Sequence, residues 1–442
     1  MQVPHLTDSA SRAAVPHAGS EGGSRLPWSA VVLLASVQFA AYVDRALPAV
    51  TAPLIRAELG LADAQIGALQ GPAFVALYVI GLLAAGQWVR AVNPWRLSLA
   101  CVAVWTLGAL VFALAPDYRG MVAGRVLLGA GQAVFVPAAL MLIAGQPDFG
   151  RRSRGLSLFT TGSASGRSGA LLLGGAALVL LGGGVAGLEG WRAASLALIA
   201  PNLVLAALLI RAAATAPPPR PPETHGGLRA ALRAAGRRPL AYASIFAAGG
   251  ACVFVVQAAG AWAPSLLNRA FDLAPGQSAL VFGVIVLVFA PIGHLSAGWL
   301  MATASGRRGP APFVAGAALI AAACAAFLPV AGRTEAIVLI AGLTTAGGLA
   351  AAAVLIGVHA MTAAPQRPAM GALFLAAISV AGVAGGPWLT GLISDLRAVA
   401  GAGAGAGLAQ AVTAAAVGGS AVVIVLALAA GRLWRPPAEA AA

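Results

Sequence analysis

The sequence predicts an all-α integral membrane protein with twelve transmembrane helices, and its composition and its apolar runs are the observations that predict it. Of the 442 residues, 60% are hydrophobic and only 9% are charged, and the mean hydropathy is +0.89. A soluble chain of this length would normally carry far more charge. A hydrocarbon core of about 30 Å requires about 20 apolar residues per helix. Runs of this length are found near residues 29–55, 65–89, 95–115, 120–145, 155–181, 192–211, 239–262, 276–301, 311–332, 334–362, 368–394 and 407–431.

The arginines are distributed unevenly between the two ends of these runs. The sequence has no lysine, so all 27 basic residues are arginine. When the loops are assigned alternately to two sides, most arginines fall on the side of the termini. The other side holds only Arg56, Arg119, Arg192, Arg269, Arg333 and Arg397. Because positively charged loops stay in the cytoplasm, we expect a multi-pass protein of the cytoplasmic (inner) membrane with both termini inside.

A polar segment divides the runs into two groups of six. It contains PPPRPP, followed by Leu228, Arg229, Leu232 and Arg233 at helical spacing. Proline stiffens such a linker, and the basic helix can lie on the inner membrane surface. The first 27 residues carry charges without an apolar core, unlike a signal peptide. The predicted segments are a disordered cytoplasmic tail (1–27), an N-terminal six-helix bundle (28–211), a cytoplasmic linker with a short basic helix (212–238), a C-terminal six-helix bundle (239–432) and a cytoplasmic tail (433–442).

The sequence lacks the residue patterns that several classes of function require. Cys101, Cys252 and Cys324 each fall inside an apolar run, far from metal-ligand spacing, so we expect no metal site and no cofactor. The formal net charge is +14, but the arginines flank the apolar runs and do not form one basic patch. We therefore expect no nucleic-acid partner. The sequence contains no GxSxG or HExxH, and its GxGxxG match at 182–187 lies in a glycine-rich loop. An enzyme is therefore not expected.

Four charged side chains lie inside the apolar runs, all in the first half: Asp44, Arg45, Arg125 and Arg167. Charge at bilayer depth is costly and marks a solvated cavity or a substrate path. With a helical rise of about 1.5 Å per residue, Asp44, Arg125 and Arg167 reach similar depths. A guanidinium group forms bidentate hydrogen bonds to carboxylate or phosphate. The arrangement predicts a pocket for an anionic substrate.

The pairing of these charges decides which arginine is available to a substrate. Adjacent helical residues diverge by about 100°, so Asp44 and Arg45 point to different neighbours. We expect Asp44 to pair with Arg125, which leaves Arg45 or Arg167 as the anion anchor. One alternative is that Asp44 and Arg125 only brace two helices. Another is that Arg167 extends towards lipid.

Other polar positions complete the expected site. Arg167 follows Gly162 and Gly166, whose spacing lets helices approach closely. Gln132 lies seven residues after Arg125, on nearly the same face, and either hydrogen-bonds substrate or contacts a neighbouring helix.

The second half has no matching charge, so its wall of the pocket is expected to be mainly apolar. Its expected polar groups are Gln257, His294, Thr344, Thr345 and Ser379. One charged wall and one apolar wall suit an amphiphilic anion, such as a lipid-like or aromatic acid, better than a sugar. His294 and His359 lie near the inner ends of their runs, where a coupling role and a simple interfacial role are both open.

The two halves of the sequence carry a weak repeat. Arg56 is followed by LADAQ at 61–65, and Arg269 is followed by LAPGQ at 273–277. Six-helix halves related by an axis along the membrane normal are a common transporter architecture, with substrate bound near mid-membrane between them. Coincidence between two short loops is the alternative.

From about residue 28 to residue 432 the chain resembles the major facilitator superfamily. The similarity is greatest to its spinster-like lipid transporters, with the organic anion:cation symporters second. The motifs that carry it are YVDR at 42–45, PLIRAELGL at 53–61, QIG at 65–67, GR at 124–125, PAA at 137–139, GWR at 190–192, AWAPSLL at 261–267 and GPWLTGLISD at 386–395. The resemblance implies two pseudo-symmetric six-helix bundles, the major facilitator fold, and a bacterial transporter.

The sequence departs from this family pattern at two places. Where the superfamily has an aspartate four residues after a glycine in the loop after its second span, Gly86 is followed here by Arg90, and the repeat copy at Gly298 is followed by Ala302. Where both related branches carry a proton-carrying glutamate, this chain has Gln132, whose amide cannot take up a proton near neutral pH. Inner gating and proton coupling must therefore differ from the family pattern.

These observations predict a secondary active transporter that moves a small anionic or amphiphilic organic solute by alternating access and works as a monomer in the lipid bilayer. The predicted substrate-binding residues are Arg45, Arg125, Arg167, Gln132 and Gln257. Asp44 is the one carboxylate in this layer able to carry a proton. The alternative is a transporter-like sensor or inactive accessory membrane protein that binds a ligand without moving it.

Overall fold

The structure, a computed structural model, describes residues 26–144, 149–215, 227–303 and 309–435. Within these ranges, 12 helical segments are long and apolar enough to cross a membrane, which confirms the predicted all-α class. Most of the predicted N-terminal tail, residues 216–226 of the predicted linker and residues 436–442 of the C-terminal tail lie outside the described residues.

The helices follow one another with short connections. The N-half contains α1 (Trp28–Leu59), α2 (Asp63–Gln70), α3 (Pro72–Ala91), α4 (Pro94–Leu114), α5 (Tyr118–Ala133), α6 (Phe135–Ala144), α7 (Phe149–Leu181) and α8 (Gly190–Thr215). The basic helix expected in the linker is α9 (Leu228–Arg237). The C-half contains α10 (Pro239–Phe271), α11 (Pro275–Ala302), α12 (Ala311–Phe327), α13 (Arg333–Met361), α14 (Arg367–Ile378), α15 (Gly385–Val399) and α16 (Ala404–Ala430).

Local sequence signals set several of the tight turns between spans. Gly60 ends α1 with φ 62°, a left-handed conformation that glycine adopts without steric cost. Asn93 starts α4, because its side-chain oxygen accepts a hydrogen bond of 2.9 Å from the Trp95 N–H. Asp117 caps α5 in the same way through the Gly120 N–H at 2.8 Å. Such turns place consecutive spans side by side.

Two spans are interrupted where the halves meet. The second span breaks at Gly71, between α2 and α3, and Pro72 starts the new helix. The eleventh span contains a six-residue π-helix, η4 (Ser379–Ala384), between α14 and α15. A Cβ atom at Gly71 would lie 2.6 Å from the Ala384 carbonyl oxygen, so only glycine permits this contact. Insertions of this kind often mark functional sites.

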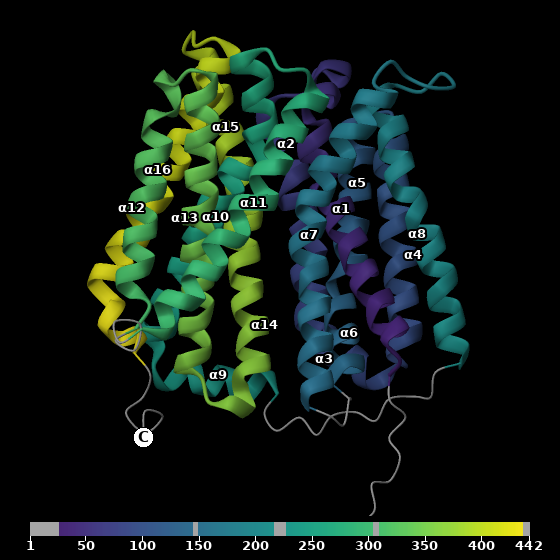
Figure 1. The fold of residues 1–442 in the computed structure, drawn as a ribbon, viewed down its shortest axis with the longest axis vertical. Helices are drawn as coiled ribbons and strands as arrows, with labels where there is room; N and C mark the ends of the chain where they lie inside the picture. The colour runs from purple at the N-terminus through teal and green to yellow at the C-terminus, as the bar shows by residue number, and fades with distance from the viewer. Residues whose placement is uncertain (1–25, 145–148, 216–226, 304–308, 436–442) are drawn as a thin grey trace, which may run out of the picture.

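The two halves lie side by side, with both described ends of the chain at the same end of the molecule (Figure 1). We call this the terminal end and the other the opposite end. Within the N-half α1 packs on α7 and α4 on α5, and within the C-half α10 packs on α16 and α12 on α13. The halves contact each other mainly through α7 with α11 and α2 with α15. Gly175 and Gly276 allow the first of these contacts, since a Cβ atom at Gly175 would lie 2.8 Å from the Gly276 carbonyl oxygen.

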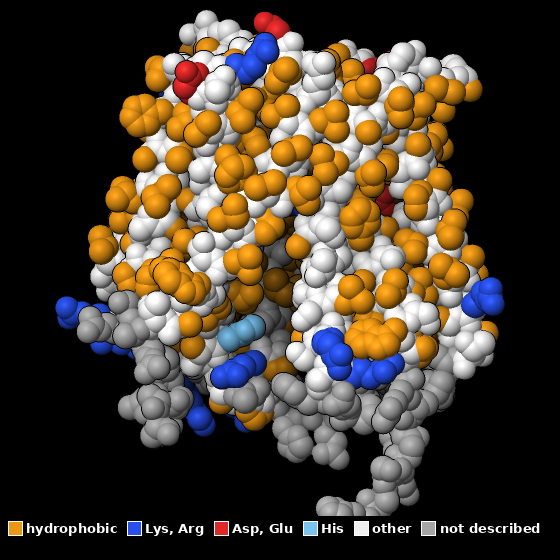
Figure 2. All heavy atoms as spheres, viewed as in Figure 1, with side chains coloured by type: hydrophobic (Ala, Val, Ile, Leu, Met, Phe, Trp, Pro, Cys, Tyr) orange, Lys and Arg blue, Asp and Glu red, His pale blue; other side chains and the backbone are white. Residues whose placement is uncertain are grey.

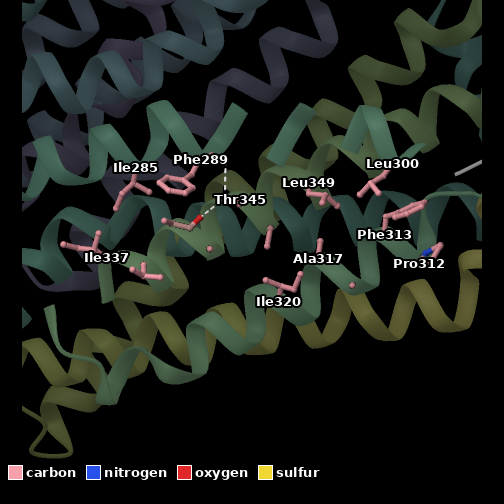
Figure 3. A pocket seen from close by; sticks show the side chains of 15 residues that line it. Ile285, Phe289, Leu300, Pro312, Phe313, Ala317, Ile320, Ile337, Thr345 and Leu349 are labelled. Carbon is pink, nitrogen blue, oxygen red and sulfur yellow. Dashed lines mark hydrogen bonds between the residues drawn. The ribbon is translucent and has the colours of Figure 1, made fainter. Parts of the chain in front are cut away.

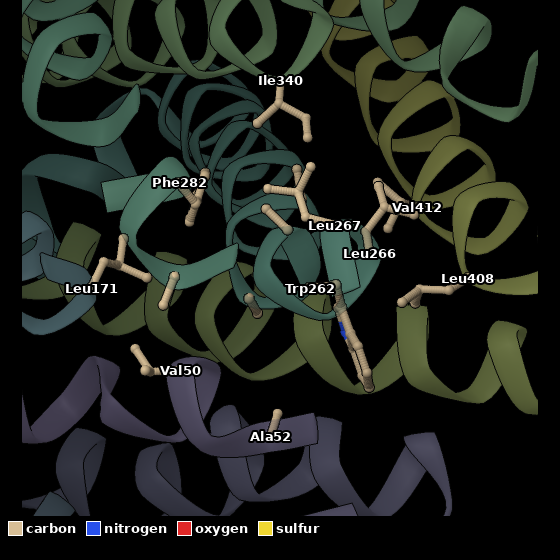
Figure 4. Packing of buried hydrophobic residues seen from close by; sticks show 14 of the residues in the cluster. Val50, Ala52, Leu171, Trp262, Leu266, Leu267, Phe282, Ile340, Leu408 and Val412 are labelled. Carbon is tan, nitrogen blue, oxygen red and sulfur yellow. The ribbon is translucent and has the colours of Figure 1, made fainter. Parts of the chain in front are cut away.

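The buried apolar residues are arranged differently at the two ends. One cluster joins both halves at the opposite end, where Val50 of α1 and Leu171 of α7 lie near Phe282 of α11 and Trp262 of α10 (Figure 4). Towards the terminal end each half has its own separate cluster. The surface is hollowed between the halves towards that end (Figure 2). The molecule is therefore closed at the opposite end and open between the halves towards the terminal end.

Candidate functional site

Arg125 is the most deeply buried of the charged residues, with 1% of its surface exposed. From α5 its Nε donates to the Leu69 carbonyl at 2.9 Å, Nη2 to the Arg45 carbonyl at 3.1 Å and Nη1 to the Asp44 carbonyl at 3.4 Å. Two of these oxygens lack a normal helical partner. Leu69 lies in the last turn of α2, and the Asp44 carbonyl faces Pro48, which has no N–H. Arg125 thus braces α1 against the break after α2.

Asp44 does not form the expected ion pair with Arg125. The contact between them runs to the backbone oxygen of Asp44, because the guanidinium is already directed at orphan carbonyls. The carboxylate instead accepts a hydrogen bond of 2.7 Å from Nδ2 of Asn202 on α8. Its Oδ1 atom is buried and has no hydrogen-bond partner in the described part of the chain. A cavity of about 10 Å³ lined by Asp44, Arg125 and Ser195 lies beside it, near the smallest volume that holds one water molecule.

Arg45 is held by an amide and by aromatic rings. Its Nε donates to Oε1 of Gln132 at 3.1 Å, and Nε2 of Gln132 donates to a carbonyl oxygen of α1 at 2.8 Å. The guanidinium carbon lies 4.4 to 4.9 Å from the ring centres of Phe74, Tyr42 and Tyr78. Gln132 therefore orients Arg45 without neutralising it, and the rings add a favourable cation–π contact.

Arg167 extends from α7 across the boundary between the halves. A Cβ atom at Gly260 of α10 would lie 2.3 Å from Arg167 Nη2. This contact points the side chain at the C-half rather than at lipid. Over the described ranges, Arg167 has neither a hydrogen bond nor an ion pair. Arg167 is thus an unpaired guanidinium between the two halves.

The glycines before Arg167 explain its position. A Cβ atom at Gly162 would lie 2.4 Å from the Ala35 carbonyl oxygen, and one at Gly166 would lie 2.6 Å from the Phe39 carbonyl oxygen. The predicted close approach of helices at this spacing is confirmed, and it packs α7 directly against α1. A Cβ atom at Gly166 would also lie 2.7 Å from the Tyr42 Cβ atom, and the Tyr42 ring centre lies 4.8 Å from the Arg45 guanidinium carbon.

The polar groups expected on the C-half wall lie in different surroundings. Gln257 is half-buried on α10, one turn before Gly260. Thr344 and Ser379 each donate the side-chain hydroxyl to the backbone carbonyl four residues earlier in the same span. Thr345 was expected on this wall, but it lines a separate groove of about 610 Å³ between α11, α12 and α13 (Figure 3). Its hydroxyl is directed at backbone carbonyls there, so it is not a polar group of the boundary between the halves.

The opposite end is held closed by an ion-pair network that the sequence does not predict. Asp63, the first residue of α2, binds Arg269 of α10 through two parallel hydrogen bonds of 2.7 and 2.8 Å. Ser394 of α15 donates to the same carboxylate at 2.7 Å, and Arg56 lies 3.1 Å from it. Asp395 accepts hydrogen bonds from two backbone N–H groups at the start of α2, at 2.9 and 2.8 Å. We call these five residues the inter-half latch.

Part of the inter-half latch is explained by the free backbone N–H groups at the N-terminus of α2. The residue before α2 is Ala62, which has no side chain able to cap the helix. The free N–H groups at the helix N-terminus favour an anion, and Asp395 supplies one from the other half. The bidentate pair of Asp63 and Arg269 is the stronger type of charged hydrogen bond. The LADAQ segment noted in the sequence is therefore a contact between halves.

Sequence comparisons agree with this architecture. Residues 34–386 match the family model of the Major Facilitator Superfamily. An MFS-type efflux pump of Mycolicibacterium smegmatis (strain ATCC 700084 / mc(2)155) is 28% identical over 288 residues, which cover 63% of this chain and 63% of the relative. The cephamycin export protein CmcT of Amycolatopsis lactamdurans is 32% identical over 168 residues, which cover 37% of this chain and 32% of the relative. The chain spans less than two thirds of the length of either relative.

Solved structures show the same fold. A bacterial homolog of the human lysosomal transporter Spinster, in an inward-facing and occupied conformation, has a TM-score of 0.77 at 20% identity, covering 91% of this chain and 95% of that chain. The inward-facing, unoccupied form has a TM-score of 0.77 at 22% identity, covering 92% and 96%. A D-xylose-proton symporter has a TM-score of 0.66 at 13% identity, covering 90% and 97%. Together with the family match, these likenesses show that the chain belongs to the Major Facilitator Superfamily of membrane transporters.

Proposed function

We propose that the protein is a secondary active transporter that moves a small anionic or amphiphilic organic solute by alternating access. The closed latch at one end and the hollow between the halves at the other support this proposal. The halves would rock around a central site, so that each end opens in turn. The excess of arginine at the terminal end supports a cytoplasmic position for that end in the inner membrane. The transporter would work as a monomer.

The observation that carries the anion assignment is the unpaired guanidinium of Arg167 between the halves. Arg167 is half-buried. A cation held partly away from water without a counter-ion is costly unless a ligand supplies the opposite charge. Arg45 is the second anchor, since Gln132 leaves its charge free. Tyr42 lies beside the Arg45 guanidinium and packs against Gly166, the residue before Arg167, so it would contact the bound solute.

The remaining predicted residues take supporting roles in this proposal. Arg125 holds α1 in place through its backbone contacts and positions Arg45. Gln132 orients Arg45, and Gln257 would contact the solute from the C-half. The aromatic rings around Arg45 and the apolar C-half wall favour a lipid-like or aromatic acid. The names of the two relatives, efflux pump and export protein, favour export as the first direction to test.

A transport assay tests the proposal against its alternative. Purified protein is first screened by thermal shift against lysophosphatidylglycerol, naphthoate and gluconate. The acid that stabilises the protein most is then used in radiolabelled form with proteoliposomes. Flux that depends on the protein supports a transporter. Binding without flux identifies a transporter-like sensor or accessory protein instead.

Replacing Gly260 with alanine should weaken binding of that acid by about tenfold, which corresponds to about 1.4 kcal/mol. The new methyl group would collide with Arg167 Nη2 and force the guanidinium to turn away. Calorimetric titration measures the affinity. Gly298→Ala on α11 is the matched control, since a Cβ atom there meets nothing within 4 Å. Equal affinity in both variants contradicts the placement of the anion beside Arg167.

Replacing Asp44 with asparagine should abolish transport driven by a pH gradient and preserve exchange of solute across the membrane. An amide has nearly the same shape as the carboxylate but cannot carry a proton. Flux into proteoliposomes with and without a pH gradient measures the difference. Asp117→Asn is the control, because asparagine caps a helix as well as aspartate does. Unchanged pH-driven flux in the Asp44 variant removes the coupling role and leaves a uniporter or exchanger.

A further inference from the structure

The short helix α9 presents a row of arginines at the terminal end of the molecule. Arg229, Arg233 and Arg237 recur every four residues, so they lie along one side of the helix. All three side chains are exposed. Leu228 and Leu232, on the adjoining side, are 40% and 52% exposed. Arginines and leucines therefore form two neighbouring exposed strips.

The third side of α9 is fixed to the C-half. Ala231 is fully buried, and Ala234 and Ala235 pack against the same apolar cluster. The helix contacts α14 and α10, and it lies at the terminal ends of the spans (Figure 1). This packing leaves the leucine and arginine strips facing away from the protein.

The described part of the protein offers these arginines no counter-charge. None of the three has a hydrogen bond or an ion pair within the described ranges. Of the described carboxylates, Asp44 lies inside a span. The others lie at the opposite end: Glu58, Asp63, Asp117, Glu189, Asp272, Glu335 and Asp395. The remaining acidic residues of the sequence, which lie outside the described ranges, are Asp8, Glu21, Asp148, Glu223 and Glu439.

We propose that α9 binds the headgroups of acidic phospholipids in the leaflet next to the terminal end. Basic residues on a helix at the surface attract anionic lipids, and apolar residues beside them enter the boundary between headgroups and acyl chains. Exposed leucines next to the arginines favour a lipid over a soluble phosphate, which would have no use for an apolar strip. Each arginine near an anionic surface strengthens binding about fivefold.

Hydrogen exchange of full-length protein in nanodiscs tests this assignment. The probe is phosphatidylglycerol, and the readout is exchange of the α9 amides in nanodiscs of phosphatidylcholine alone or mixed with phosphatidylglycerol. We expect exchange to slow about tenfold or more with phosphatidylglycerol. The triple variant Arg229→Gln, Arg233→Gln, Arg237→Gln should lose this protection. Equal exchange of the unaltered protein in both nanodiscs overturns the proposal.

Two further variants locate the lipid contact on α9. Arg96→Gln, Arg154→Gln, Arg211→Gln removes the same charge from the terminal end of the N-half and should leave α9 protected. Loss of protection in that variant contradicts a contact specific to α9. The variant Leu228→Ser, Leu232→Ser should reduce protection although all arginines remain.

Two additional measurements cover a soluble ligand and a folding defect. Inorganic phosphate added to phosphatidylcholine nanodiscs should give no protection, and equal protection by phosphate overturns the lipid assignment. If the triple glutamine variant does not fold, Arg229→Lys, Arg233→Lys, Arg237→Lys takes its place. It should keep the protection, and its loss despite a folded protein contradicts an electrostatic contact with the membrane.

Discussion

Replacing Arg167 with glutamine is expected to weaken binding of the transported acid about ten- to a hundredfold. A hydrogen bond to a charged group contributes about 1.5 to 3 kcal/mol, and each 1.4 kcal/mol is about a factor of ten in affinity. Arg167 can contribute fully, because no protein group competes for its guanidinium within the described ranges. Calorimetric titration with the acid identified by thermal shift measures the loss.

Two further variants show whether the loss comes from the site. Arg154→Gln makes the same substitution near the start of α7, on an exposed side chain, and should leave the affinity unchanged. Arg167→Lys keeps the charge but loses the planar fork, so its affinity should lie between those of the glutamine variant and the unaltered protein. Unchanged affinity in Arg167→Gln would contradict the role of Arg167 as the main anchor of the anion.

Replacing Asp63 with asparagine is expected to open the opposite end of the molecule. The substitution leaves Arg269, whose side chain is 9% exposed, without its carboxylate partner. Breaking a buried pair in this way costs about 3 to 5 kcal/mol, so even half of that energy shifts the balance between the two conformations at least about tenfold. The free energy is lost only in the conformation that closes this end, because Asp63 and Arg269 belong to different halves.

Double electron–electron resonance measures the opening as the distribution of distances between two nitroxide labels. Labels at Glu189 and Ala400 lie in exposed loops of the two halves at the opposite end. The labels are attached to cysteines introduced at these two positions, so the native cysteines are replaced first. We expect Asp63→Asn to populate longer distances. Asp272→Asn, at the same end but outside the latch, should not, since asparagine accepts the positive φ of 54° found there. Identical distance distributions in the unaltered protein and Asp63→Asn would contradict a closing role for the latch.

Much of the fold could be predicted from the sequence because each span is a local signal. Apolar length gave the twelve helices, and the spacing of Gly162 and Gly166 gave the close packing of α7 on α1. The position of Pro48 four residues after Asp44 also held information, since it leaves a carbonyl that Arg125 satisfies. The free carbonyl can be predicted from the sequence alone, but Arg125 can be identified as its donor only when the neighbouring helix is known.

Contacts between distant helices could not be predicted in this way. Asn202 was visible as an amide inside an apolar run, yet nothing local identifies Asp44 as its partner. Asp63 and Arg269 are separated by 206 positions and belong to different halves. Their pairing depends on how the halves meet, which no periodicity encodes. The same limit applies to Gly260, whose role appears only once Arg167 lies against it.

The most direct test of the proposed anion site compares an amphiphilic acid with its neutral amide. The two ligands have nearly the same shape and apolar surface, so their difference in affinity reports the charge alone. We predict that calorimetric titration of the unaltered protein will show at least about tenfold tighter binding of the acid. The preference should disappear in Arg167→Gln. Equal affinity of the unaltered protein for acid and amide would contradict an anion carrier with an unpaired guanidinium group between its halves.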